Sequence, residues 1–295
     1  MNNIKAPFAY FGGKGSVASM VWRRIGDVPW YVEPFFGSGA VLLARPHVPK
    51  FETVNDLDGL LVNFWRSVKK DPESVVMHYE CPLSEIDLLA RHTWLLEHNK
   101  EIQQRISADP NFCDTMAAAF WVYVQSGSAI KRGLFTERAS PQVASYPPGG
   151  AGALFVRGEL LPYLEALRDR LSGVAIRSGD WHRCVQSSTM LTGNKQMAGV
   201  FLDPPYPETD AQYETGATAF EEARAWAFEN GRDRRLRICL CGYYDGTDPP
   251  AGWDTVAWKA TGGHGNKAHG TGRANARRER LWFSPHCLSD STRLL

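Results

Sequence analysis

The sequence has almost no net charge. Its 33 lysines and arginines stand against 32 aspartates and glutamates, which leaves a formal net charge of +1. The strongly basic balance typical of many nucleic-acid-binding proteins is absent, so any contact with nucleic acid must depend on local clusters of charge. The sequence also has no apolar run long enough to span a bilayer, and its first residues have no apolar core like that of a signal peptide. We therefore expect neither a membrane span nor a secretory signal.

Cysteines are few and scattered. The six cysteines show no spacing typical of a disulfide framework, which favours reduced thiols in a cytoplasmic protein. Cys239 and Cys241 lie in an apolar run, where strand alternation turns both side chains to one face, and we interpret them as small buried residues. The histidines and the cysteine near the C-terminus fit no usual zinc spacing, so we expect no metal site.

The first part of the chain alternates short strands with helices. Apolar periodicity predicts a helix over residues 17–25, strands over 30–33 and 51–54, and helices that begin near residues 41 and 60. This β-α-β-α order indicates an α/β fold with a Rossmann-like parallel sheet. Such a sheet binds ligands at the carboxyl ends of its strands.

The alternation of strands and helices stops near residue 69. From about residue 71 to residue 171 the pattern is mainly helical, and strands return at residues 174–176, 199–202 and 236–240. The sequence therefore predicts one α/β domain, residues 1–68 and 174–295, interrupted by an inserted, mainly helical domain, residues 69–173.

The most informative motif is Asp203-Pro204-Pro205-Tyr206, which directly follows an apolar strand. It suits the methylation of an aromatic exocyclic amine, whose lone pair is delocalised into its ring and is therefore poorly nucleophilic. The Asp203 carboxylate and a carbonyl of the Pro-Pro turn can each accept one N–H and free that lone pair, since prolines have no N–H of their own. Tyr206 offers a flat face on which a base can stack. By itself, such a tetrapeptide can also be an ordinary loop.

A glycine turn follows the first predicted strand. Gly37 and Gly39 let the backbone approach a ligand closely, and the N-terminus of the next helix favours a carboxylate there. Asp56 lies about 20 residues downstream, where an acidic side chain binds ribose hydroxyls in such folds. Asp56 could equally cap a helix. Leu42 occupies the position of the third glycine of the dinucleotide fingerprint, which argues against an NAD-dependent dehydrogenase.

Four motifs together resemble the Dam-like DNA adenine methyltransferases of the D12 class. In chain order they are residues 7–14 (P-F-A-Y-F-G-G-K), 31–43 (Y-V-E-P-F-F-G-S-G-A-V-L-L), 55–56 (N-D) and 203–206 (D-P-P-Y). Residues 278–285 look like the terminal strand of that family. The long insertion before D-P-P-Y is similar to that of the α group of amino-methyltransferases, in which it forms the target-recognition domain. Four such motifs rarely occur in this order by chance.

The resemblance implies a site-specific DNA adenine-N6 methyltransferase that uses S-adenosylmethionine and acts on double-stranded DNA. A flipped-out adenine would be held by Asp203 and the Pro204 carbonyl and stacked near Tyr206, with no covalent enzyme intermediate. The residues implied at the cofactor, besides Asp203, are Tyr10, Gly12, Lys14, Glu33, Phe35, Gly37, Gly39, Asp56 and Asp180. Two of them keep alternatives: Asp180 could be a simple turn residue, and Glu33 a solvated charge at the edge of the sheet.

Two basic groups are candidates for DNA contacts, in addition to Lys14. Lys131 and Arg132 lie where the family carries an Asn-rich, Arg-containing segment, and they fit contacts to phosphates or guanine edges. Because this segment departs from the family pattern, the recognised base sequence stays open. A basic, Gly-rich tract that includes Arg273 and Arg277 could follow a DNA backbone or be a solvated loop, and only Glu279 opposes its charge.

Two alternative functions fit the same residues less well. One is a DNA-binding protein that keeps the fold without the chemistry, which the intact D-P-P-Y and Gly-x-Gly motifs disfavour. The other is a methylase of RNA or of cytosine amines, although cytosine-amine enzymes more often present Ser than Asp before Pro-Pro-Tyr. A solitary methylase, a phage-borne one and the partner of a restriction enzyme look alike in sequence. We expect a cytoplasmic location in a bacterial cell or a phage-infected host, and the oligomeric state stays open.

Overall fold

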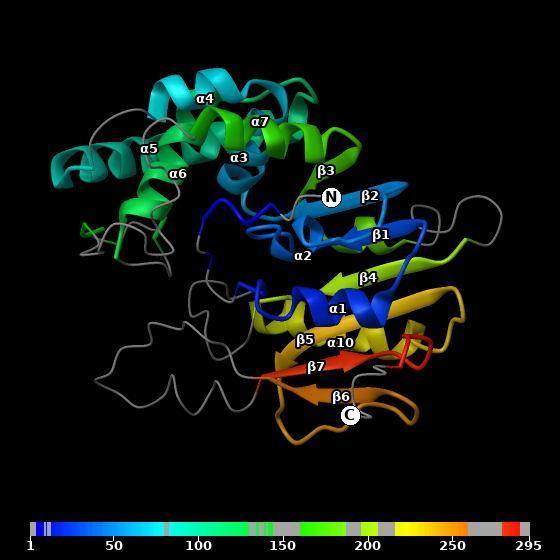
Figure 1. Cartoon of the computed structure of the whole chain (residues 1–295). Coiled ribbons are helices and arrows are strands. Elements are labelled where there is room, and N and C mark those ends of the chain that lie inside the picture. The colour runs from blue at the N-terminus through cyan, green and yellow to red at the C-terminus, as the bar shows by residue number, and fades with distance from the viewer. Residues whose placement is uncertain are drawn as a thin grey trace.

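The computed structural model describes residues 4–8, 10, 13–79, 83–129, 134–135, 139, 141–143, 160–186, 196–205, 216–258 and 279–289. In this part of the chain a twisted sheet has helices on its two faces, and a further group of helices packs at one edge (Figure 1). The predicted α/β class is confirmed.

Seven strands form the sheet of the described residues: β1 (Trp30–Glu33), β2 (Phe51–Asp56), β3 (Val174–Ser178), β4 (Ala198–Leu202), β5 (Leu236–Tyr243), β6 (Asp254–Ala257) and β7 (Glu279–Phe283). Their order across the sheet is β3-β2-β1-β4-β5-β7-β6. The first five strands in that order pair in parallel, whereas β7 runs antiparallel to both of its neighbours. Because the order changes direction at β1, ligands are expected at the carboxyl ends of β1 and β4.

Alternate residues of the central strands face two different cores. On one face Cys239 and Cys241 pack in the cluster that contains α1 (Ala18–Ile25). On the other face Ile238 packs in the cluster that contains α10 (Gly216–Asn230). Both cysteines are fully buried, as the alternation along the strand predicts, and Figure 1 shows α1 and α10 on opposite faces of the sheet.

The helices of the middle of the chain form a separate layer beside β3 and β2 (Figure 1). They are α3 (Gly59–Lys70), α4 (Pro72–Tyr79), α5 (Glu85–Ala108), α6 (Thr115–Gly127) and α7 (Leu160–Leu171). α3 packs against α5, α6 and α7 and also against β2 and β3, so it joins this layer to the sheet. None of the described helices combines the length and the apolar character that crossing a membrane requires.

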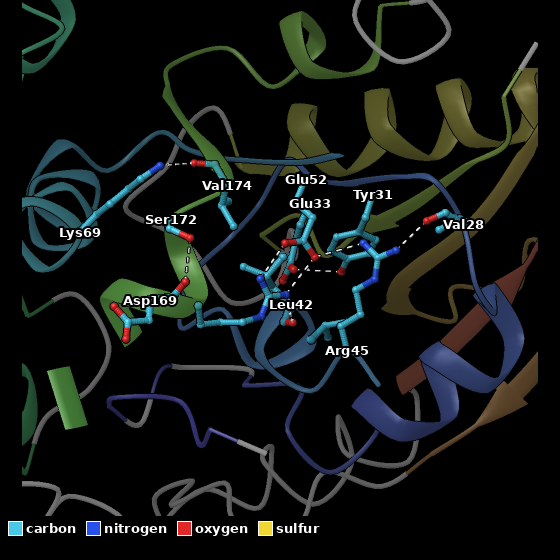
Figure 2. A network of polar contacts seen from close by, with 12 residues as sticks. Val28, Tyr31, Glu33, Leu42, Arg45, Glu52, Lys69, Asp169, Ser172 and Val174 are labelled. Carbon is cyan, nitrogen blue, oxygen red and sulfur yellow. Dashed lines mark hydrogen bonds and ion pairs between the residues drawn. The ribbon is translucent and has the colours of Figure 1, made fainter. Parts of the chain in front are cut away.

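A buried ion-pair network ties the last of these helices to the sheet (Figure 2). Glu52 on β2 accepts from Nη1 of Arg45 at 3.1 Å and from Nη1 of Arg170, on α7, at 2.6 Å. Nη2 of Arg170 also donates to the Leu42 carbonyl at 2.9 Å, and Nη2 of Arg45 donates to the Val28 carbonyl at 2.6 Å. The network connects α7 to segments that are more than a hundred residues away in sequence.

Two elements near the C-terminus were not predicted from the sequence. The buried positions of α10, among them Phe220, Ala223 and Ala227, follow helical spacing, so a signal was present and was missed. β6 has four residues and alternates between half-buried and exposed positions, with Val256 as its only large aliphatic side chain. Such a short edge strand gives almost no periodic signal.

Candidate active site

Asp203 of the D-P-P-Y motif forms an ion pair with Lys14. Asp203 follows β4 directly, and its Oδ2 accepts a hydrogen bond from the Lys14 Nζ at 2.7 Å. The side chain of Lys14 is 4% exposed and that of Asp203 is 20% exposed. Burial disfavours the charged form of Lys14, but Asp203 and other negative groups outweigh it and raise the pKa of the ammonium. The pair therefore joins two distant sequence motifs as opposite charges.

Asp203 and the glycine turn lie at the same edge of the sheet. β1 and β4 are adjacent and parallel, with Val32 opposite Val200, and both run toward this edge. β1 ends at Glu33, which interacts electrostatically with Asp203. Pro204 is buried and Pro205 is half-buried. The topology thus places the predicted methyl-acceptor motif one strand away from the predicted cofactor motif.

The glycine turn has the backbone geometry that its sequence demands. Gly37 and Gly39 have φ angles of +49° and +67°, a region that favours glycine. A Cβ on Gly37 would lie 3.0 Å from the ring of Tyr10, and a Cβ on Gly39 would lie 2.7 Å from the ring of Phe36. The missing Cβ atoms therefore make room for two aromatic rings of the protein, which the sequence did not reveal.

The helix after this turn is too short for its N-terminus to attract an anion strongly. α2 (Ala40–Leu43) has only four residues, and its N-cap is Gly39. A single turn sums few peptide dipoles, so the predicted attraction of a carboxylate by its N-terminus is small. The turn is positioned instead by side chains: the Trp65 Nε1 donates to the Gly37 carbonyl at 3.1 Å.

Asp56 is the last residue of β2, and its carboxylate binds the glycine turn by a hydrogen bond. Its Oδ2 accepts from the Gly37 N–H at 2.9 Å, and its Oδ1 accepts from the Asp58 N–H at 3.1 Å. Burial raises the pKa of Asp56, against the effect of these backbone donors. The alternative role as a helix N-cap is wrong, because Asp58 caps α3 by accepting from the N–H groups of Leu60 and Leu61.

Glu33 is buried, with 2% of its surface exposed. Its Oε2 accepts a hydrogen bond from the Tyr31 hydroxyl at 2.9 Å (Figure 2). Burial raises the pKa of Glu33 well above its usual range, although the Tyr31 hydrogen bond lowers it. The alternative of a solvated charge at the edge of the sheet is therefore wrong.

Phe35 and Asp180 both lie beside Trp181. Phe35 is half-buried, and its ring packs on that of Trp181 at a centroid distance of 5.5 Å. Asp180 follows β3, is exposed, and accepts from the backbone N–H of His182 at 2.9 Å. That hydrogen bond stabilises the start of α8 (His182–Val185). The same hydrogen bond lowers the pKa of Asp180. The turn role of Asp180 is visible, while a cofactor contact stays a prediction.

Several predicted site residues lie outside the described part of the chain. They are Gly12, Tyr206, Lys131, Arg132, Arg273 and Arg277. Their roles stay predictions. The described residues contain no group of three or more histidines, cysteines, aspartates and glutamates that could hold a metal ion.

Sequence reasoning placed Glu279 in the terminal strand but missed its interaction with Lys14. That Glu279 opposes the charge of the basic tract before it stays a prediction, because that tract lies outside the described residues. In the structure Glu279 begins β7, is 8% exposed, and interacts electrostatically with Lys14 and Asp203. The signal that could have found it is the alternation of the terminal strand, which turns Glu279 to the same face as Leu281 and Phe283.

One comparison with known proteins found a family domain in the first part of the chain. The model of the D12 class N6 adenine-specific DNA methyltransferases matches residues 10–132. The chain carries a domain of this methyltransferase family. The match includes Lys14, the glycine turn and Asp56, and it continues through α4, α5 and α6. No curated protein matches the chain.

This domain implies methylation of adenine N6 in DNA, with S-adenosylmethionine as the methyl donor. The protein is therefore an S-adenosylmethionine-dependent methyltransferase, and the alternatives of RNA or cytosine amines as substrates are not supported. The match ends at residue 132, so the D-P-P-Y motif and β7 lie outside it.

The strain of the glycine turn gives a first testable prediction. Replacing Gly39 with alanine should destabilise the fold by about 2 kcal/mol, because the left-handed conformation costs roughly 1–2 kcal/mol with a Cβ and the Phe36 ring must also move. Urea unfolding measures this change. The matched control is Gly173→Ala, where a Cβ meets nothing within 4 Å and the free energy of unfolding should stay within about 0.5 kcal/mol. Equal effects of both substitutions would contradict the interpretation.

Proposed function

We propose that the protein binds double-stranded DNA, flips an adenine out of the helix, and holds its amino group at Asp203 and the Pro204 carbonyl. The observation that supports this most is the Lys14–Asp203 ion pair of 2.7 Å at the carboxyl edge of the sheet, one strand from the glycine turn. The ion pair orients the carboxylate before substrate arrives, and a preorganised acceptor loses little free energy on reorganisation.

The chemistry follows from the acceptors that this segment offers. Asp203 and the Pro204 carbonyl each accept one N–H of the amine, so its lone pair is no longer drawn into the ring. Neither Pro204 nor Pro205 has an N–H that could compete for these acceptors. The ion pair with Lys14 orients the Asp203 carboxylate as an acceptor. Transfer then depends on positioning in line with the methyl donor, and no covalent enzyme intermediate is needed.

The described residues near the glycine turn fit S-adenosylmethionine chemically. S-adenosylmethionine supplies an activated methyl group on a sulfonium, and it also carries an ammonium and ribose hydroxyls. Three carboxyl groups, Glu33, Asp56 and Asp203, surround this edge of the sheet, which suits a cationic ligand. We propose that Asp56 holds the ribose, that Glu33 faces the ammonium, and that Phe35 packs on the methionine part. Tyr10 and the two glycines would line the same pocket.

We further propose that residues 69–173 form the target-recognition domain, inserted between residues 1–68 and 174–295. The helices α4 to α7 pack in one layer beside β3. Lys131 and Arg132 would contact DNA from this domain, and Arg273 and Arg277 from the catalytic domain. Because phosphate contacts release counterions, binding should weaken as salt rises.

One experiment tests the proposed function. The purified protein is incubated with tritiated S-adenosylmethionine and genomic DNA that lacks adenine methylation, and the DNA is then mapped for modified bases. We expect label only in N6-methyladenine, at every occurrence of one short recognition sequence. DNA binding without incorporation of label would contradict the proposal and favour an inactive DNA-binding protein.

A further inference from the structure

Glu279 reaches the proposed active edge because β7 is antiparallel to the strands beside it. β5 runs toward that edge and ends at Tyr243, and β7 begins at Glu279, which pairs with Tyr243. The first residue of β7 therefore lies at the edge where the parallel strands end. Asp203 follows β4, the neighbour of β5 on the other side. The last strand in sequence thus places a carboxylate at this edge of the sheet.

The carboxylate of Glu279 is buried and incompletely paired. Glu279 is 8% exposed, and its Oε2 has no hydrogen-bond partner among the described residues. A buried acceptor without a donor costs roughly 1–3 kcal/mol, more when it is charged. Charged residues in such positions are seldom kept for stability alone, and strained or unpaired groups concentrate at functional sites.

Trp258 connects Glu279 to Lys14. The backbone N–H of Trp258 donates to the Glu279 carbonyl at 3.3 Å, just after β6 ends. The ring of the same tryptophan has its centroid 5.8 Å from the Lys14 Nζ. Glu279 raises the pKa of Lys14, and Lys14 in turn lowers that of Glu279. The Lys14 ammonium is therefore paired with Asp203, lies near the Trp258 ring and interacts electrostatically with Glu279.

We propose that Glu279 is a positioning residue of the methyl-transfer site, which acts through Lys14 to hold the Lys14–Asp203 ion pair in place. The inference rests on the proposed role of Asp203 in accepting the adenine N–H. When Asp203 shares its charge with the substrate amine, Lys14 would otherwise be a buried cation with a weakened partner, which is unfavourable. Glu279 supplies the second negative charge, so Lys14 stays an ammonium and Asp203 keeps its orientation.

Other ionisable groups face the same place, and they define the expected pH dependence. Cys241 on β5 interacts with Lys14 and Asp203, and Glu33 on β1 interacts with Asp203. Arg280 donates to the Glu279 carbonyl, and its guanidinium lies over the Tyr244 ring. Burial raises the pKa of Glu279, Lys14 lowers it, and Asp203 raises it further. Glu279 therefore takes up its proton at a higher pH than an exposed glutamate does.

The test compares Glu279→Gln and Glu279→Asp with the wild type and with Glu222→Gln. Glu222 lies on the exposed side of α10, so its replacement removes the same charge far from Lys14. Steady-state methylation of unmethylated genomic DNA is measured against pH, together with the KM for S-adenosylmethionine and the melting temperature. Wild-type activity in this assay tests the proposed function separately.

For Glu279→Gln we expect a kcat about 10-fold lower at pH 8. A tenfold change is the size of the effect that one pKa unit has on an equilibrium constant. The KM for S-adenosylmethionine should not change. The difference in kcat between Glu279→Gln and the wild type should shrink as pH falls, since wild-type Glu279 is then protonated too. The melting temperature at pH 8 should be equal or higher, because an acid whose pKa is raised by folding destabilises the fold when ionised. Glu279→Asp should recover part of the rate, and Glu222→Gln should match the wild type.

Two outcomes would overturn the inference while the wild type remains active. One is a Glu279→Gln enzyme whose kcat equals that of the wild type and falls with decreasing pH in the same way. The other is a slower enzyme whose deficit is the same at every pH and whose melting temperature is lower, since that pattern indicates a purely structural role. An inactive wild type would instead contradict the proposed function.

Discussion

Replacing Asp203 with alanine is expected to abolish methyl transfer while S-adenosylmethionine binding stays largely intact. The carboxylate is the acceptor that the proposed mechanism places on the adenine N–H, and removing such a preorganised group lowers kcat on the order of 10³-fold. We expect cofactor affinity to depend mainly on the glycine turn and on Asp56, whose Oδ2 accepts from the Gly37 N–H. Labelled methyl incorporation measures the first quantity, and calorimetric titration with S-adenosylmethionine measures the second.

The stability of the variant must be controlled, because Asp203 is the partner of a buried lysine. Lys14 is 4% exposed, so alanine at residue 203 leaves its ammonium without its nearest counter-charge. Asp203→Asn keeps the shape and should show the same loss of kcat with less unfolding. The matched control is Asp254→Asn, which breaks a second ion pair of 2.7 Å, that with Arg24, away from the glycine turn. Near-wild-type methylation by folded Asp203→Asn would remove Asp203 from its proposed role.

The first half of the fold could be predicted because its signals are local. β1 and β2 are short apolar runs, and the turn between β1 and α2 carries glycines where the backbone has positive φ. Each of these features depends on neighbours in sequence, so periodicity and residue type suffice. The D-P-P-Y motif was found in the same way, since it directly follows the buried strand β4.

The second half depends on contacts that sequence patterns do not record. The place of β7 between β5 and β6 is a pairing between distant segments, and no residue of the strand encodes which neighbours it takes. The strand that contains Glu279 was expected, but the electrostatic interaction of Glu279 with Lys14 was not, because it depends on which strands lie beside β7. The Lys14–Asp203 pair spans 189 residues and was likewise not predicted as a contact. Long-range pairs of charges are set by topology.

Replacing Glu52 with glutamine is expected to destabilise the fold by about 3–5 kcal/mol, the usual cost of removing one partner from a buried ion pair. Glu52 is 4% exposed and holds Arg45 and Arg170 together (Figure 2). Without its charge two guanidinium groups remain close to each other in the interior. Urea unfolding at neutral pH, followed by tryptophan fluorescence, measures the change. A total stability of roughly 5–15 kcal/mol makes this loss large.

The control for Glu52 is a carboxylate that forms an ion pair on the exposed surface of the same helix, α7. Glu165→Gln removes the partner of Arg168, 3.9 Å away on the exposed side of α7, and should cost less than about 1 kcal/mol. A comparable loss in both variants would show that Glu52 contributes no more than a surface pair. Arg170 belongs to α7, while Arg45 and Glu52 follow the glycine turn in sequence. A large loss confined to Glu52→Gln therefore means that this contact between the helical layer and the sheet contributes strongly to stability. The proposed target-recognition domain would then be structurally coupled to the edge where methyl transfer is proposed to occur.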